Sequence, residues 1–191
     1  MRFVLPKCKN KGCTNQATIK INMANFCSVD CAYQHARNLQ DKARAAKERK
    51  AKQDHRKRKQ DLKSRSEWLK EAQAIFNKYI RLRDAGQPCI SCQRHHQGQY
   101  HAGHYLTVGA RPELRFEELN VHKQCSACNN HLSGNLVNYR INLITKIGKT
   151  KVEWLEGPHE PMQLSIEEIK ELIAEYKAKV KELIANQKET G

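Results

Sequence analysis

Four cysteines in the middle of the chain form a pattern typical of a metal site. Cys89 and Cys92 make one C-x2-C pair, and Cys125 and Cys128 make a second. Zinc binds four thiolates tetrahedrally, and each such pair supplies two corners of the site from one short turn. The two pairs therefore predict one zinc ion bound by four thiolates. Because such a site has no open coordination position, we expect this zinc to be structural and not catalytic.

A second group of four cysteines lies near the N-terminus, at Cys8, Cys13, Cys27 and Cys31. The spacings within this group are looser than C-x2-C. A small domain that lacks a large core commonly needs a metal ion or disulfides to fold. We therefore expect a second structural zinc, and the alternative is a set of free cysteines in a small core.

Six side chains that can move protons or bind hard cations lie between or beside the central pairs: His101, His104, Asn120, His122, Asn129 and His131. A neutral imidazole, with a pKa of about 6.5, can accept a proton from water at neutral pH. Asparagine and histidine can hold a divalent cation and leave positions for a phosphate oxygen. Since four thiolates already complete the zinc site, these side chains favour a second, catalytic metal site over extra zinc ligands.

The order Cys-x2-Cys, His, Asn, Cys-x2-Cys-Asn resembles that of HNH nucleases, which have the ββα-metal fold, and especially phage junction-cleaving enzymes in which a zinc knuckle braces the catalytic hairpin. Segments 102–105, 114–116, 122–125 and 128–137 are more closely similar to the NinG (Rap) recombination proteins of lambda-like phages. The N-terminal cysteines, a basic arm and a charged final helix also fit that family, so the resemblance covers nearly the whole chain.

The resemblance implies a catalytic role for three residues of this sequence. His104 matches the general-base position of the HNH pattern. Asn120 matches the middle asparagine, which braces a loop and orients the base. Asn129, directly after the second cysteine pair, matches the final metal-ligand position.

One position departs from the pattern. Many HNH enzymes have Asp or His directly before the base, where this chain has Gly103. His101, on the same expected strand, is our candidate for the missing ligand, and His131 and His122 are alternatives. The predicted ligands of the catalytic ion are therefore His101, Asn129 and His131.

The function that the resemblance implies is a structure-specific DNA endonuclease. Its substrates would be branched recombination intermediates such as Holliday junctions and D-loops, its catalytic ion Mg²⁺ or Mn²⁺, and its other partners phage or host recombination proteins. Residue types alone support only a zinc-bearing protein that binds a polyanion. Two alternatives therefore stay open: a non-catalytic zinc-finger protein that binds DNA junctions, and an adaptor whose zinc modules bind proteins.

A basic stretch separates the two cysteine groups. Residues 38–63 contain eleven Lys and Arg against four Asp and Glu, a net charge of +7, and neither Gly nor Pro. Such a sequence favours a helix but has little apolar surface to bury. It is either a solubilising run or a strip that neutralises phosphates, and the overall charge of +15 favours phosphates. The candidate DNA-binding residues are Lys42, Arg44, Lys47, Arg49, Lys50, Lys52, Arg56, Lys57, Arg58 and Lys59.

The remaining pattern predicts the elements that position these groups. Apolar residues at helical spacing predict a helix from Ser66 to about Gly86 and another over 136–147, ended by Gly148. A short strand should end at His104. A capping box at Ser165 begins the last helix.

We therefore expect a mainly helical α+β protein, with a small zinc-stapled ββα-metal core, a separate N-terminal zinc module and long flanking helices. The predicted boundaries are 1–37 for the N-terminal zinc module and 38–65 for the basic arm or linker. The HNH-like domain would cover 66–150 and a charged amphipathic helix 151–191. That last helix could form a homodimer interface, which would suit an enzyme that cuts two strands.

Composition excludes two classes of protein. No stretch approaches the roughly 20 apolar residues that span a bilayer, and the segment 1–6 is too short for a secretory signal. We expect a protein of the host bacterial cytosol, bound to DNA and not to a membrane. Since thiols stay reduced in the cytosol, the eight cysteines are better explained as metal ligands than as disulfides.

Overall fold

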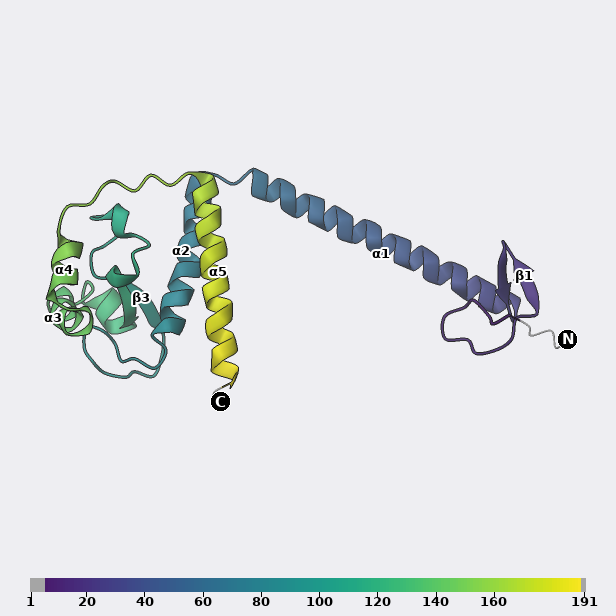
Figure 1. Cartoon of the computed structure of the whole chain (residues 1–191), viewed down its shortest axis with the longest axis horizontal. Coiled ribbons are helices and arrows are strands. Elements are labelled where there is room, and N and C mark those ends of the chain that lie inside the picture. The colour runs from purple at the N-terminus through teal and green to yellow at the C-terminus, as the bar shows by residue number, and fades with distance from the viewer. Residues whose placement is uncertain (1–5, 190–191) are drawn as a thin grey trace. The chain divides into compact units, whose positions relative to one another are not determined.

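The computed structural model describes residues 6–189. The prediction about a secretory signal was drawn from residues 1–6, of which only Pro6 lies within the described residues. The chain forms two compact units, Met1–Lys63 and Ser64–Gly191 (Figure 1). Both units are mainly helical and each contains one two-stranded sheet. The prediction of a mainly helical α+β protein is confirmed. No described helix is long and apolar enough to cross a membrane.

The first unit begins with the N-terminal cysteine group. Strands β1 (Ile19–Ile21) and β2 (Ala24–Phe26) form an antiparallel hairpin. Its turn residues, Asn22 and Met23, have φ angles of 46° and 65°, as expected for a two-residue hairpin turn. This hairpin brings Cys27 back toward Cys8 and Cys13.

Helix α1 (Val29–Asp61) follows directly, with no buried residue. The Ser28 side chain caps it by accepting a hydrogen bond from the Cys31 backbone N–H at 3.2 Å. The helix therefore begins inside the cysteine module, before the start of the arm predicted at residue 38. Its 33 residues make it about 50 Å long.

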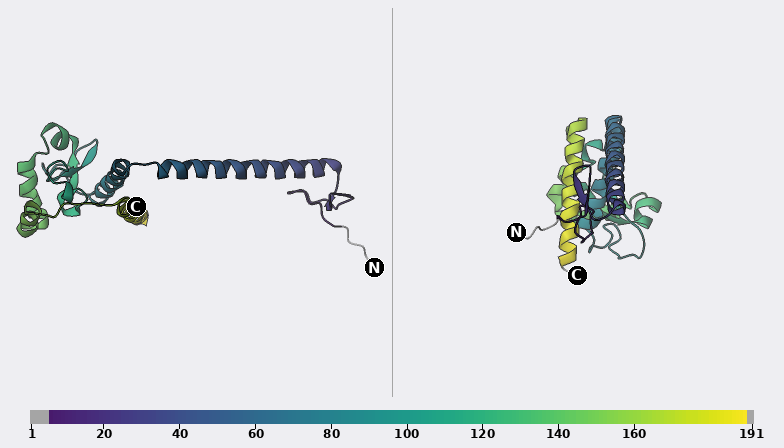
Figure 2. Two further views of the ribbon diagram at one scale, coloured as in Figure 1. Left: turned by 90° about the horizontal axis from the view of Figure 1, so that it is seen from above. Right: turned by 90° about the vertical axis from the view of Figure 1, so that its right-hand side faces the viewer.

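Two long helices build the main core of the second unit. Helices α2 (Arg65–Arg83) and α5 (Ile166–Glu189) lie side by side (Figures 1 and 2). Reciprocal hydrogen bonds between Ser64 and Glu67 cap α2, whose first residue lies one position before the predicted start. The capping box predicted at Ser165 is confirmed by its bonds with Glu168. The core side chains they share include Trp68, Phe76, Ile80, Ile169, Ile173 and Tyr176.

A short hairpin packs against α2. Strands β3 (Tyr100–His104) and β4 (Val121–Cys125) are antiparallel, and Gly103 faces His122. The strand predicted to end at His104 is confirmed. Three short helical turns flank β4: η1 (Pro112–Leu114), η2 (Glu118–Asn120) and the π-helical η3 (Ala127–His131).

Helices α3 (Leu136–Ile147) and α4 (Lys149–Glu156) form a second core with the loop after β3. Gly148 ends α3 as predicted, with a φ of 89°. The last helix begins after Ser165 as predicted, but the segment 151–191 that was assigned to it also contains the end of α4 and a non-helical stretch. Gly157 and Pro158, which follow α4, account for this break.

A buried ionic network joins α2 to the hairpin. The Arg83 guanidinium donates to both carboxylate oxygens of Asp84, at 2.9 and 3.0 Å, and to the carbonyls of Glu118 and Val121. Asp84 also accepts from the Lys123 backbone N–H at 3.0 Å. Burial alone would raise the pKa of Asp84, but hydrogen bonds from the His122 and Arg83 side chains hold it well below its usual range.

Asp84→Asn should lower the free energy of unfolding by about 3 kcal/mol, because it removes the buried negative charge that faces Arg83 and Lys146 and leaves Glu118, at 3.7 Å, as the remaining carboxylate beside the guanidinium. The lowered pKa means that the Asp84 carboxylate stabilises the fold above about pH 4, where the unfolded side chain is ionised. That contribution is lost as the pH falls further. Denaturant titrations at pH 7 and pH 3 should therefore show a smaller difference between wild type and variant at pH 3 than at pH 7, since the contribution is only partly lost one unit below the unfolded pKa. Exposed Glu160→Gln is the control, and an equal effect of the two substitutions would contradict this account.

Candidate active site

The four central cysteines meet although they come from three different segments. Cys89 and Cys92 follow α2, Cys125 ends β4 and Cys128 lies in η3. Their sulfur atoms all lie within 4.8 Å of one another, and three of the four residues are buried. This group, the central tetrad, can hold one zinc ion, as its spacing predicts.

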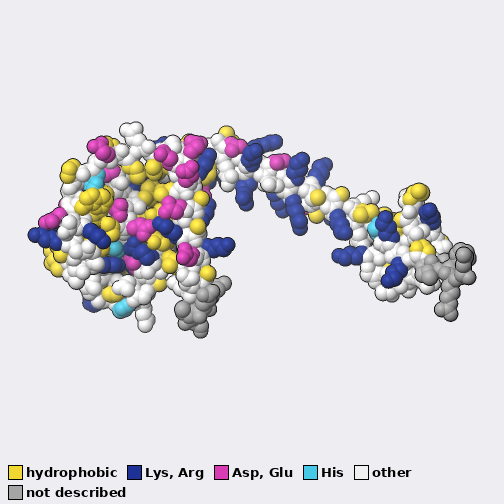
Figure 3. All heavy atoms as spheres, viewed as in Figure 1, with side chains coloured by type: hydrophobic (Ala, Val, Ile, Leu, Met, Phe, Trp, Pro, Cys, Tyr) yellow, Lys and Arg dark blue, Asp and Glu magenta, His cyan; other side chains and the backbone are white. Residues whose placement is uncertain are grey.

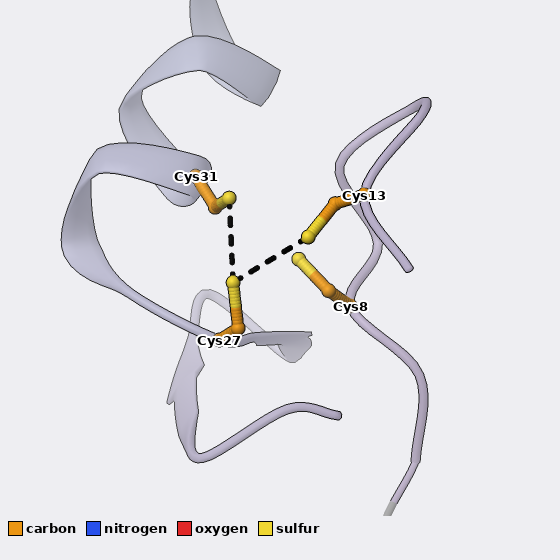
Figure 4. Close-up of side chains that lie close together, drawn as sticks. All are labelled: Cys8, Cys13, Cys27 and Cys31. Carbon is orange, nitrogen blue, oxygen red and sulfur yellow. Dashed lines mark hydrogen bonds between the residues drawn. The ribbon is translucent and has the colours of Figure 1, made fainter. Parts of the chain in front are cut away.

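The N-terminal cysteines form a second group of the same kind, the N-terminal tetrad. Cys8 and Cys13 approach from one loop, Cys27 follows β2 and Cys31 lies in the first turn of α1 (Figure 4). The Cys27 sulfur lies 3.5 Å from that of Cys13 and 3.4 Å from that of Cys31. Tetrahedral Zn–S bonds of about 2.3 Å would place sulfurs about 3.8 Å apart. The described geometry is therefore close to what a zinc ion requires.

Two polar side chains next to the central tetrad were not predicted from the sequence. The His96 ring nitrogen Nε2 lies 3.1 Å from the Cys92 sulfur, and the Asn135 amide donates to the Cys128 sulfur at 3.6 Å. Burial alone would raise the pKa of the Cys92 thiol, but hydrogen bonds, led by that from His96, lower it to about 6. Such outer contacts favour the thiolate that binds metal.

His104 and Asn129 line one cavity of about 480 Å³ beside the hairpin. His104 is the last residue of β3, and Asn129 lies in η3, which follows β4 in the sequence. The cavity is lined by Ala102, His104, Thr107, Val108, Asn129, Ser133, Gly134 and Leu136. The structure thus brings together the predicted general base and the predicted final metal ligand.

The His104 ring is held in one orientation. Its Nε2 lies 3.0 Å from the Arg115 carbonyl oxygen. Because a carbonyl can only accept, Nε2 carries the proton and the neutral ring keeps its lone pair on Nδ1. Burial is the main cause that lowers the pKa of His104 below its ordinary value. The ring is therefore neutral at neutral pH and can accept a proton.

Asn120 braces the loop that follows His104. It is fully buried. Its amide oxygen accepts from the Leu106 N–H at 2.8 Å, and its amide nitrogen donates to the carbonyls of Leu106 and Leu114 at 2.9 and 3.2 Å. These bonds fix the loop between β3 and β4 and leave the Asn120 side chain outside the cavity lining.

The segment after Cys128 has an uncommon backbone. The π-helix η3 ends in a bond from the Leu132 N–H to the Ala127 carbonyl at 3.1 Å. Ser133, Gly134 and Asn135 then all have φ between 45° and 85°. Backbone of this kind is uncommon and is often found at functional sites. Here it forms one wall of the cavity and supports Asn129.

The structure does not bring the other predicted ligands to this cavity. Neither His101 nor His131 is among its lining residues in the described part of the chain. His131 is exposed at the end of η3, whereas side-chain alternation along β3 places His101 on the opposite face from His104. His122 lies in the buried Arg83–Asp84 network, with its ring nitrogens near Arg83 and the Leu119 carbonyl.

The predicted DNA-binding residues all lie on α1 and are all exposed. Figure 3 shows Lys and Arg side chains along the length of this helix. Since α1 buries no residue, its charges lie on every side of the helix. Such a helix can neutralise phosphates from any side. Phosphate contacts carry no sequence information, so this binding would not depend on the bases.

Comparison with known proteins shows the family. Residues 3–187 match the model of the bacteriophage lambda NinG protein family, so the chain belongs to the NinG family. It is 50% identical to protein ninG of Escherichia phage lambda over 116 residues, which cover 61% of this chain and 57% of that protein. It is 49% identical to protein ninG of Salmonella phage P22, with the same coverage, and 47% identical to that of Escherichia phage 933W.

These matches span less than two thirds of the curated relatives' own length, 57% for the lambda and P22 proteins and 58% for the 933W protein. No solved structure gives a significant match to this chain.

If both tetrads bind zinc, the purified chain should contain two zinc ions, as measured by elemental analysis. Cys27→Ala and Cys125→Ala should each reduce this to one, because the three remaining thiolates hold zinc far more weakly. Loss of zinc from the N-terminal tetrad should leave the thermal unfolding of the second unit nearly unchanged, whereas loss from the central tetrad should lower its midpoint. Wild-type protein that contains no zinc would contradict both assignments.

Proposed function

We propose that this protein is a metal-dependent, structure-specific DNA endonuclease with an HNH-like core. The observation that carries the proposal is the cavity that both His104 and Asn129 line. The β3–β4 hairpin followed by η3 and α3 supplies the strand, strand and helix order that the ββα-metal resemblance calls for. The NinG family match and the basic helix α1 support a nucleic-acid substrate.

The residues of the cavity fit a divalent cation such as Mg²⁺ or Mn²⁺. Asn129 offers an amide oxygen, a ligand that hard cations prefer. When bound, the ion would stabilise the negative charge that develops on the phosphate and on the departing oxygen. His101 and His131, the other ligands predicted from the sequence, do not line this cavity, so the proposal gives them no bond to the ion.

His104 performs the proton transfer in this proposal. Its Nδ1 lone pair takes a proton from the water that attacks the phosphorus, while the Arg115 carbonyl holds the ring in place. The P–O3′ bond breaks, so that the products carry 5′-phosphate and 3′-hydroxyl ends. Asn120 fixes the loop after the base, and Asn129 would hold the cation.

Branched recombination intermediates are the proposed substrate. Holliday junctions and D-loops are what the NinG resemblance implies, and the basic α1 would track the phosphates of one arm in the host cytosol. A homodimer built through α5 would place two active sites on one junction. Phage or host recombination proteins are the proposed further partners.

A labelled four-way junction and a matched linear duplex, incubated with and without Mg²⁺ or Mn²⁺, test the activity. Wild type should cut the junction only with added metal. His104→Ala should lower the rate by about 10²–10⁴-fold, because the water loses its base. The exposed His95→Ala is the matched control and should cut normally. Gel-mobility shifts of the DNA without cleavage at any metal concentration would favour the junction-binding alternative. A cleavage rate of His104→Ala equal to that of wild type would contradict the assignment of His104 as the base.

The salt dependence of junction binding tests α1. Log K for junction binding falls as log salt rises. For every phosphate that the protein no longer neutralises, this slope should become about 0.9 less steep. Changing Arg56, Lys57, Arg58 and Lys59 to Gln keeps helix propensity and should weaken binding and flatten this slope. The charge-matched control changes four exposed lysines of the second unit to Gln, namely Lys70, Lys78, Lys149 and Lys151. Equal slopes for both variants would show that α1 has no special role in binding.

A further inference from the structure

An apolar cavity of about 450 Å³, the N-terminal groove, lies between the β1–β2 hairpin and the first turns of α1. The apolar α1 residues that line it recur at three- and four-residue spacing, namely Val29, Ala32, Tyr33 and Ala36. Such a stripe normally packs against a core. Here Val29 and Tyr33 are 68% and 63% exposed. A contiguous exposed apolar surface of this kind indicates a binding site.

The aromatic side chains of the groove suit a flat ligand. The Arg37 guanidinium lies over the exposed Tyr33 ring, 5.4 Å from the ring centre. The rings of Phe26 and His35, which also line the groove, lie 5.5 Å apart. Nucleobases stack on aromatic side chains and on guanidinium groups, and this stacking is largely independent of sequence because every base has a π-face.

The charge around the groove favours a polyanion as its occupant. Residues 1–63 contain 17 Lys and Arg against five Asp and Glu, which gives +12 of the chain's net charge of +15. Lys9 lines the groove itself, and none of the described residues that line it is acidic. A second copy of the chain would bring the same positive charge to this surface and would be repelled.

Positive side chains continue from the groove onto α1. A neighbouring cavity of about 480 Å³ shares His35 with the groove and is also lined by Lys11 and Lys42. The acidic residue of this second cavity, Asp41, is paired with Arg44 at 3.5 Å. The phosphates next to a base held in the groove would therefore meet cations on the same unit.

We propose that the N-terminal groove binds an unpaired base of the DNA substrate, which stacks on Tyr33 while the adjacent phosphates contact Lys9, Lys11 and Lys42. This inference rests on the proposed function, since DNA is the ligand, and it narrows the substrate class. The preferred branched intermediates are those with unpaired bases beside the branch, such as the displaced strand of a D-loop. A linear duplex, in which every base is paired, would leave the groove empty.

A labelled oligothymidine and an abasic strand of the same length test this proposal, because they carry the same phosphates and differ only in bases. Binding to the zinc-loaded full chain is measured by fluorescence anisotropy without added Mg²⁺ or Mn²⁺. Wild type should bind the oligothymidine more tightly. Tyr33→Ala should weaken that binding about fivefold or more, through loss of one stacking contact, and leave binding of the abasic strand unchanged. Tyr33→Phe keeps the ring and should bind as wild type does. Leu62→Ala, which changes an exposed apolar residue at the other end of α1, is the control.

Equal binding of the two strands by wild type would overturn the proposal. Equal weakening of both strands in a Tyr33→Ala variant that still holds two zinc ions would do the same. A DNA-free dimer that Tyr33→Ala dissociates would show that a second copy fills the groove instead. A base preference that appears only after removal of residues 1–5 would show that this segment fills it. Either result would also overturn the proposal.

The salt dependence and the cleavage assay separate this inference from the proposed function. Tyr33→Ala removes no phosphate contact, so its slope of log K against log salt should equal that of wild type, and a flatter slope would contradict the role in stacking. If wild type cuts junctions with Mn²⁺ but binds both strands equally, only this inference fails. If wild type prefers the oligothymidine but cuts no DNA with either metal, the endonuclease proposal fails and the base-binding groove stands.

Discussion

The central tetrad is the constraint on which the arrangement of the second unit depends. Its four sulfurs join the loop after α2, the end of β4 and the π-helix η3. The buried cluster around the tetrad consists of the cysteines themselves, with Tyr100 packed against them. A zinc ion bound there would hold η3, and with it Asn129, against the hairpin that carries His104.

The remaining polar contacts determine how the hairpin lies within that frame. Arg83 and Asp84 attach β4 to the end of α2, while Asn120 fixes the loop between the strands. The Arg115 carbonyl then sets the tautomer of His104. These contacts are made largely by buried groups, so they hold His104 rigidly, and the proposed proton transfer requires such a fixed geometry.

Local patterns in the sequence predicted the features that depend on near neighbours. The cysteine pairs, the strand ending at His104, the Ser165 cap and the end of α3 at Gly148 all follow from spacing or from one residue type. The short helix α4 was missed because its eight residues carry a weak apolar pattern and directly follow Gly148. Family resemblance, not periodicity, led to the prediction that His104 is the base.

Features that depend on distant parts of the chain could not be predicted. The opposite orientations of His101 and His104 follow from strand alternation, but which face meets the cavity depends on how η3 packs. The hydrogen bond from Gln124 to the Ser91 hydroxyl joins residues that lie 33 positions apart in sequence. His96 and Asn135 reach the tetrad sulfurs only once the loops are folded.

The most direct test of the account is the anomalous scattering of Mn²⁺ in crystals of the zinc-loaded protein. The account predicts zinc at both tetrads and a separate manganese peak in the cavity lined by His104 and Asn129. A cavity that stays empty at saturating Mn²⁺, or a His104 ring that replaces a thiolate at the central zinc, would contradict it.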